Sequence, residues 1–175
     1  MSITSQDRIL LYISKARNAT LDNLQQGTGI VSTTGRTISD LQSQAAADRI
    51  DLAEQFLAVA DRLVRARPPM FRVAVGRYYY AMYHSMRAVV FYVESGDDHE
   101  DHSRLPTKTP QDFIQHAYWQ NELKDARLRR NEADYDPYPA QDFDFKAQAL
   151  HVRKQSHLLI VQARQYLRTK GCVYL

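Results

Sequence analysis

The sequence is poor in cysteine and has no long apolar run. Its one cysteine, Cys172, lies near the C-terminal end, which excludes an internal disulfide framework and a zinc site built from several cysteines. No apolar run approaches the roughly 18–20 residues of a membrane-spanning helix, and the first residues lack the basic-then-apolar order of a signal peptide. We therefore expect a cytoplasmic protein without a membrane segment.

Glycine and proline are scarce as well, with six of each among 175 residues. They gather in a few places, such as the Pro68–Pro69 pair, and the long stretches between them are rich in Ala, Leu, Arg and Gln. These stretches lack the alternation of apolar and polar residues that half-buried strands show. The sequence thus predicts an all-α fold, and its length fits one domain with a short appendage.

Apolar residues at helical spacing predict several helices. The expected ranges are 5–24, 39–65, 71–94, a helix that starts near 109, 121–133 and 142–170. A glycine- and threonine-rich stretch predicts a flexible linker over 26–37. We therefore expect residues 1–37 to form an N-terminal helix with its linker, and residues 38–175 to form a helical bundle.

The segment 71–94 is apolar nearly all round, which is typical of a buried helix that others pack against. Arg77 and His84 are seven residues apart, so they lie on one stripe of this helix, two turns apart. A buried arginine needs an anionic partner, and in one interpretation Arg77 belongs to a structural ion pair and His84 to the core. In the other, both line a cleft where His84 serves acid–base chemistry, because histidine titrates near pH 7.

The segment 126–139 is dense in charge. It carries three arginines, an asparagine and a tyrosine, namely Arg127, Arg129, Arg130, Asn131 and Tyr135. Guanidinium groups bind phosphate oxygens in a bidentate manner, so the segment is a candidate grip for a phosphodiester. The alternative is a solvated helix end whose charges pair internally. Glu132 and Asp134 are the candidate ion-pair partners of Arg77.

The last predicted helix is basic, since no Asp or Glu occurs between residues 145 and 175. Five of its side chains fall in an arc of about 60° on the helical wheel, namely Lys146, Arg153, His157, Arg164 and Arg168. Such a basic stripe is a candidate contact for an RNA backbone, and the net charge of +3 is compatible with a polyanionic partner. A solvated basic face without a ligand is the alternative.

Other chemistry has little support in the sequence. His99 and His102 lie among four acids, but their spacing fits no zinc pattern, and we expect an exposed acidic loop there. Glycine-rich phosphate loops, H-E-x-x-H and G-x-S-x-G are all absent, which disfavours P-loop NTPases, Rossmann dehydrogenases, thermolysin-like proteases and α/β-hydrolases. We predict no metal and no cofactor.

Two motifs, GRYYYAMYHSMRAVVF over 76–91 and RLRRNEADYDPY over 127–138, resemble the HEPN superfamily. They are similar to the R-x-Y-Y-A-M-(F/Y)-H helix and the later R-x-x-A-D-Y of small prokaryotic HEPN proteins, and the resemblance covers roughly residues 40–170. It implies an up-and-down bundle of four or five helices, usually a homodimer. It also implies an RNA-related role, often in toxin–antitoxin or defence systems.

Catalytic HEPN proteins are metal-independent endoribonucleases with an R-x(4–6)-H motif, in which the arginine holds the phosphate and the histidine helps to activate the ribose 2′-hydroxyl. Aligning the motif on Arg130 and Asn131 places Tyr135 at the histidine position, and a phenol with an ordinary pKa near 10 transfers protons poorly at neutral pH. If Arg77 and His84 reach the same cleft, these five residues form the site and His84 assists cleavage.

Two functions therefore remain open, and with them the question of whether the chain is an enzyme. The first is a HEPN-like RNA-directed protein, either a metal-independent endoribonuclease or a relative that binds RNA without cleaving it. The second is a non-catalytic dimeric helical module that partners a nucleotidyltransferase, an antitoxin or another defence component. The absence of the motif histidine, which Tyr135 replaces, and the N-terminal appendage favour the second. A nucleotide-binding sensor is a third hypothesis, which no glycine-rich loop supports.

Overall fold

The computed structural model describes residues 5–96 and 102–175, and this part of the chain is all-α, without a strand. Its elements are α1 (Ser5–Ser14), α2 (Asn18–Thr34), α3 (Ile38–Arg65), α4 (Phe71–Glu94), η1 (Leu105–Lys108), α5 (His116–Tyr135), η2 (Asp142–Phe145) and α6 (Lys146–Thr169), where η marks a 3₁₀-helix. The predicted all-α fold is confirmed. Over the described ranges, none of the helices combines the length and the apolar character needed to cross a membrane.

The chain divides into two compact units, Met1–Leu41 and Gln42–Leu175. In the first unit, the predicted helix over 5–24 is interrupted between α1 and α2, and the predicted flexible linker over 26–37 is wrong, because α2 continues to Thr34. Two interior glycines cost helix stability without forbidding the helix. The helix ends where Gly35 adopts the left-handed conformation and donates its N–H to the Val31 carbonyl at 2.9 Å.

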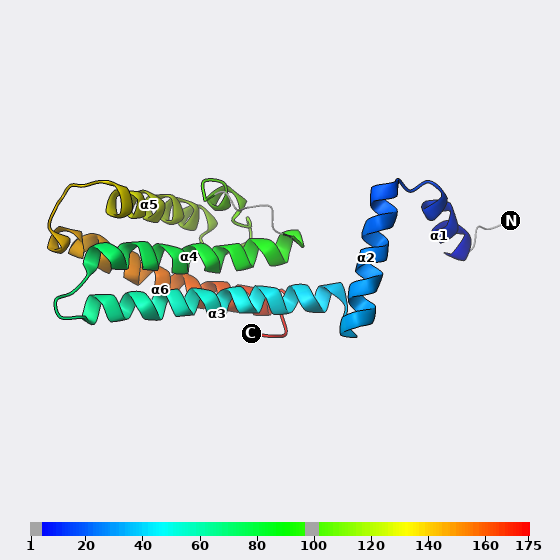
Figure 1. Cartoon of the computed structure of the whole chain (residues 1–175), viewed down its shortest axis with the longest axis horizontal. Coiled ribbons are helices and arrows are strands. Elements are labelled where there is room, and N and C mark those ends of the chain that lie inside the picture. Colours follow the sequence, from blue (N-terminus) through cyan, green and yellow to red (C-terminus); the bar gives the residue numbers. More distant parts are fainter. Residues whose placement is uncertain (1–4, 97–101) are drawn as a thin grey trace. The chain divides into compact units, whose positions relative to one another are not determined.

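The second unit is a bundle of α3, α4, α5 and α6, with α4 at its centre (Figure 1). The helix α4 packs against both α5 and α6. Its buried side chains include Tyr78, Tyr79, Met82 and Met86, which share one apolar core with Trp119 of α5 and with Leu159 and Leu167 of α6. The predicted ranges 39–65 and 71–94 agree with α3 and α4, because a long apolar pattern ends at strong breakers on both sides.

Two predicted boundaries are wrong. The structure has one helix, α5, where the sequence predicted one helix from near 109 and another over 121–133. Residues 109–115 form turns that bury Phe113, and Gln115 takes a positive φ of 54° just before α5 begins. The last α-helix begins at Lys146 and not at Asp142, because residues 142–145 form the 3₁₀ turn η2 that leads into it. The Asp142 carboxylate accepts the backbone N–H groups of Phe71 and Arg72 at 2.7 and 3.0 Å. It therefore caps the N-terminus of α4 from a distant position in the chain.

One carboxylate ties three helices of the bundle together. Asp61 of α3 accepts a hydrogen bond from the Tyr78 hydroxyl of α4 at 2.7 Å and one from Nε of Arg153 of α6 at 2.8 Å, and Nε2 of His157 lies 3.3 Å away. Burial acts to raise the pKa of Asp61, but the hydrogen bonds from Arg153 and Tyr78 outweigh it and hold the pKa at about 2. The carboxylate is thus more stable in the folded chain than in the unfolded one.

We expect Asp61→Asn to lower the free energy of unfolding by about 2 kcal/mol at neutral pH. The pKa of Asp61 lies below its ordinary value of 3.8 in the folded chain. Its contribution is therefore fully present above about pH 4 and is lost as the pH falls towards about 2. Urea unfolding between pH 7 and pH 2 checks this, with Asp48→Asn as the control because Asp48 is an exposed aspartate of the same helix. Parallel pH profiles for wild type and Asp61→Asn below pH 4 would contradict it.

Candidate functional site

Arg130 lies at the centre of a group of tyrosines between α5 and α4. It is only 9% exposed. Its Nη1 donates to the hydroxyl of Tyr135 at 3.2 Å and to Oδ1 of Asn131 at 3.0 Å, and its Nη2 donates to the hydroxyl of Tyr80 at 3.0 Å. The guanidinium carbon lies 5.4, 5.4 and 5.7 Å from the ring centres of Tyr79, Tyr80 and Tyr135. We call Arg130, Tyr79, Tyr80 and Tyr135 the Arg130–tyrosine cluster.

The guanidinium has only a loose anionic partner. Oδ2 of Asp134 lies 3.5 Å from Nε of Arg130, which is too long for a good hydrogen bond. Among the described residues, no acceptor satisfies this buried Nε. The Asp134 side chain is itself 39% exposed, so water screens its charge. The positive charge of Arg130 is therefore buried mainly against phenol rings and hydroxyl oxygens, an arrangement that leaves it able to attract a further anion.

The hydroxyls of Tyr80 and Tyr135 present hydrogen-bond donors on the side away from Arg130. A phenol oxygen that accepts a hydrogen bond still has its own proton to donate. Because both oxygens accept from Arg130, both protons are directed away from it. Tyr135 is also 72% exposed, so its ring presents an aromatic surface to solvent at the edge of the cluster. The cluster thus offers two hydroxyl donors and a stacking surface to an anionic aromatic ligand such as a nucleotide.

A small cavity of ≈ 180 Å³ adjoins the cluster and is lined by Val73, Gly76, Arg77, Tyr80 and Asp134. Its volume is below the roughly 300–1,000 Å³ of pockets for drug-sized ligands, so it can hold only a small group, and its lining carries one cation, Arg77, and one carboxylate, Asp134. Gly76 allows Asp134 to approach α4 closely, since a Cβ at this position would lie 3.3 Å from Oδ1 of Asp134. The cavity brings Arg77 next to Tyr80, the hydrogen-bond partner of Arg130.

The prediction that Arg77 is buried is wrong. Arg77 is exposed, and its guanidinium carbon lies 6.0 Å from the Phe56 ring. The expected pairing of Arg77 with Glu132 or Asp134 is absent from the described part of the chain, because Asp134 lies beside Arg130 and Glu132 accepts from Gln148 at 3.0 Å. The sequence pattern shows that α4 is apolar nearly all round. It does not show which narrow strip of the helix surface is exposed to solvent. The structure places Arg77 on that strip, where its charge is available at the cavity.

His84 is packed as an aromatic ring. It stacks on Phe56 with ring centres 5.3 Å apart and planes 9° apart, and it lies 6.5 Å from the Tyr80 ring. Burial, reinforced by the charges of Arg87 and Arg49, lowers the pKa of His84 to about 4. Its Nδ1 is buried and has no hydrogen-bond partner among the described residues. His84 therefore borders the cluster as a neutral ring and does not reach Arg130 by a hydrogen bond.

A second histidine, His102, lies beside the cluster, where the sequence predicted only an exposed acidic loop. Its Nδ1 lies 2.7 Å from the Tyr79 hydroxyl, and its ring stacks on Tyr83 at 4.1 Å. Burial raises the pKa of Tyr79, so this phenol keeps its proton at neutral pH, and its hydroxyl shares a hydrogen bond with Nδ1 of His102. The sequence placed His102 in an acidic loop, and no local signal links it to Tyr79. Its companion His99 lies outside the described residues.

The predicted RNA-binding stripe on α6 is largely paired with acids of α3. Arg153 and His157 face Asp61, and Arg164 lies 2.6 Å from Glu54 and 3.8 Å from Asp51. Lys146 lies 5.0 Å from the Phe143 ring centre, and Arg168 is exposed. On α5, Arg129 donates to Asp125 at 2.7 Å and Arg127 is half-buried. Arg129, Arg153, His157 and Arg164 thus face acids, whereas no acidic partner is seen within the described residues for Arg127, Lys146 and Arg168. At the cavity, Arg77 also has no acidic partner among the described residues, and Arg130 has only the loose contact with Asp134.

No protein-family model matches the chain, and no curated protein matches it. The likeness to the HEPN superfamily therefore stays a prediction that rests on the two motifs. The structure does bring these motifs together, because Arg130 of the second motif donates to Tyr80 of the first.

We expect His84 to remain neutral well below the pH at which histidine ordinarily titrates. An NMR titration that follows the ring nitrogens is predicted to give a midpoint near the pKa of about 4 that burial imposes. The neutral ring stacks on Phe56 and its Nδ1 has no hydrogen-bond partner among the described residues. We therefore expect His84→Phe to change the free energy of unfolding by no more than about 1 kcal/mol. A midpoint near the ordinary value of 6.5 would contradict this description of the ring.

Proposed function

We propose that the chain is a HEPN-like, RNA-directed protein that binds an RNA phosphate at the Arg130–tyrosine cluster. The observation that carries the proposal is the buried Arg130 guanidinium, which is 9% exposed and hydrogen-bonded to two tyrosine hydroxyls. Buried arginines are usually neutralised by a carboxylate at hydrogen-bond distance, and Asp134 is too distant for that. An incoming phosphate would complete the charge balance.

The cluster supplies the chemistry that single-stranded RNA requires. The hydroxyls of Tyr80 and Tyr135 would donate to phosphate oxygens, and the exposed Arg77 would pair with the same phosphate or the next one along the strand. The outward ring of Tyr135 would stack on a base, an interaction that every base can make. This mode of binding depends on backbone charge and stacking, so we expect little sequence preference.

Binding is better supported than cleavage. Activation of a ribose 2′-hydroxyl needs a group that exchanges protons near neutral pH. Tyr135 occupies the motif position of the histidine, and His84 has a pKa of about 4 and no hydrogen bond to the cluster. We therefore infer an RNA-binding relative of the metal-independent endoribonucleases. A homodimer, a role in a toxin–antitoxin or defence system, and a cytoplasmic location accompany this proposal through the resemblance alone.

A second candidate function is the non-catalytic interaction module, with a nucleotidyltransferase or an antitoxin as its partner. It is favoured by the apolar side chains that the first unit exposes, namely Ile9, Leu10, Leu11, Tyr12, Ile13, Leu24, Ile30 and Val31. Contiguous exposed apolar residues are typical of protein-interaction surfaces. This candidate predicts no binding of RNA at the cluster, so the following experiment separates the two.

We expect Arg77→Ala to weaken binding of a fluorescent single-stranded RNA by roughly three- to tenfold, because one phosphate contact is lost. The slope of log affinity against log salt should fall by about 0.7, the value for one contact to a single strand. Fluorescence anisotropy at several salt concentrations measures both effects. Arg62→Ala is the matched control, since Arg62 is an exposed arginine of the neighbouring helix α3. Equal losses for Arg77→Ala and Arg62→Ala would contradict a site at the cavity.

Tyr135→His is expected to create or raise metal-independent cleavage of RNA, because it restores a group that titrates near neutral pH at the histidine position of the motif. The measurement is a timed digestion of end-labelled RNA in EDTA, followed on a denaturing gel. Tyr138→His is the control, because Tyr138 is 76% exposed and lies three residues further along the same segment. Equal cleavage by the two variants would contradict the alignment of the chain on the HEPN motif.

A further inference from the structure

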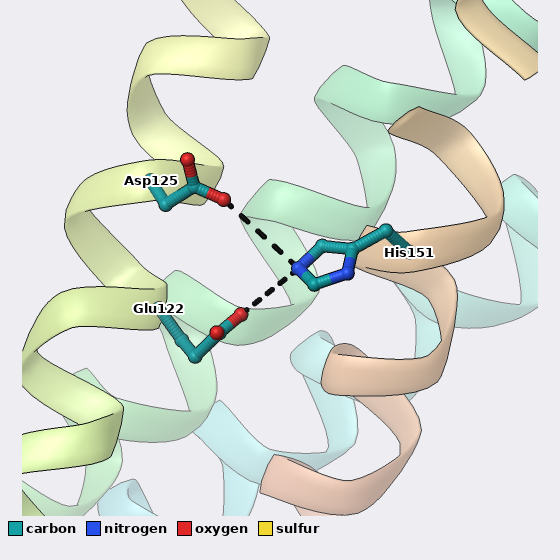
Figure 2. A group of neighbouring side chains, drawn as sticks. All are labelled: Glu122, Asp125 and His151. Atoms are coloured by element: carbon teal, nitrogen blue, oxygen red, sulfur yellow. Dashed lines mark hydrogen bonds and ion pairs between the residues drawn. The ribbon is translucent and has the colours of Figure 1, made fainter. Parts of the chain in front are cut away.

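Away from the Arg130–tyrosine cluster, the described residues contain one group of acidic and histidine side chains that lie close enough together to hold a metal ion. Glu122 and Asp125 lie one turn apart on α5, and His151 faces them from α6 (Figure 2). Nε2 of His151 lies 3.1 Å from Oε2 of Glu122 and 3.9 Å from Oδ2 of Asp125. All three donor atoms lie within 4.8 Å of one another.

These separations are close to those of a bound metal. A zinc ion with ligands at about 2.1 Å in tetrahedral geometry holds its donor atoms about 3.4 Å apart. The Glu122–His151 pair is already this close, whereas Oδ2 of Asp125, which also accepts from Arg129, would have to move closer to Nε2 of His151. The two acids project from one face of α5 because residues at i and i+3 are neighbours on a helix. The backbone therefore needs no rearrangement to present three ligands.

We propose that Glu122, Asp125 and His151 bind a transition-metal dication, with Zn²⁺ as the best match. One imidazole nitrogen and two carboxylate oxygens form a donor set that Zn²⁺ and Mn²⁺ accept, whereas Ca²⁺ and Mg²⁺ prefer oxygen ligands alone. Three protein ligands leave a position for water. Since the ligands come from α5 and α6, the ion would tie together two helices of the bundle, one of which carries Arg130.

The net charge of this group is negative, which favours the binding of a dication. Two carboxylates face one imidazole, and Nε of Arg129 donates to Oδ2 of Asp125 at 2.7 Å. With a neutral imidazole, the three side chains and Arg129 carry a net negative charge. Either a metal ion or a proton on His151 can compensate this negative charge. A bound metal ion would stabilise the folded chain in a saturable way that depends on the concentration of the ion.

The test is a titration of Zn²⁺ into the full chain, freed of metals with a chelator that is then removed, using calorimetry and thermal unfolding. We expect one equivalent to bind, and a hundredfold excess over Kd to raise the melting temperature by roughly 5–10 °C. Both Glu122→Gln and His151→Ala should weaken binding at least tenfold while keeping the metal-free melting temperature near that of wild type. Visible absorption of the Co²⁺-loaded chain reports on direct coordination by protein ligands and should change in both variants.

The matched control is His116→Ala, which removes a half-buried histidine at the start of α5 and leaves the proposed ligands intact. It should bind Zn²⁺ as wild type does. Two results would overturn the proposal: the absence of saturable binding to wild type, which would make the group an ion-pair network only, and unchanged binding by both Glu122→Gln and His151→Ala, which would place the ion elsewhere. Because the readouts do not involve RNA, the outcome is independent of the proposed RNA binding.

Discussion

The burial of one guanidinium against tyrosine rings is the interaction on which the candidate site depends. A charged group taken out of water loses several kcal/mol of hydration, and Arg130 recovers it from hydroxyl oxygens, an amide oxygen and the electron-rich faces of three rings. These partners carry no full charge. With the Asp134 carboxylate only loosely placed at 3.5 Å from Nε, the cation is solvated mainly by neutral groups of the protein, and this favours the binding of a further anion.

The bundle places these partners through one helix. Consecutive residues of a helix point about 100° apart, so the tyrosines at positions 78, 79 and 80 point in different directions. Because α4 is buried on almost every side, each of them contacts a different neighbour. Tyr78 binds Asp61 of α3, Tyr79 meets His102, and Tyr80 accepts from Arg130 of α5. The cap that Asp142 supplies to α4 holds the first turn of the same helix. Core packing and the site therefore share α4, so substitutions that disturb its position should affect stability and binding together.

Sequence reasoning succeeded where the signal is local. The bounds of α4 follow from a long apolar segment between strong breakers, and the grouping of Arg130, Asn131 and Tyr135 follows from their spacing on one helix end. It failed where the answer depends on tertiary contacts. The contact of His102 with Tyr79 and the pairing of the α6 stripe with acids of α3 join residues far apart in the chain. The exposure of Arg77 depends on how the other helices pack around α4. The error at α2 is different, since glycine lowers helix propensity but does not decide it alone.

The central claim is that the chain binds RNA, and one measurement tests it most directly. Purified protein is incubated with end-labelled bulk tRNA, with and without EDTA, and the samples are run in parallel on native and denaturing gels. We expect RNA that is retarded on the native gel, intact on the denaturing gel and released by added salt, since the binding rests on phosphate contacts. RNA that is both intact and unshifted at low salt would contradict it.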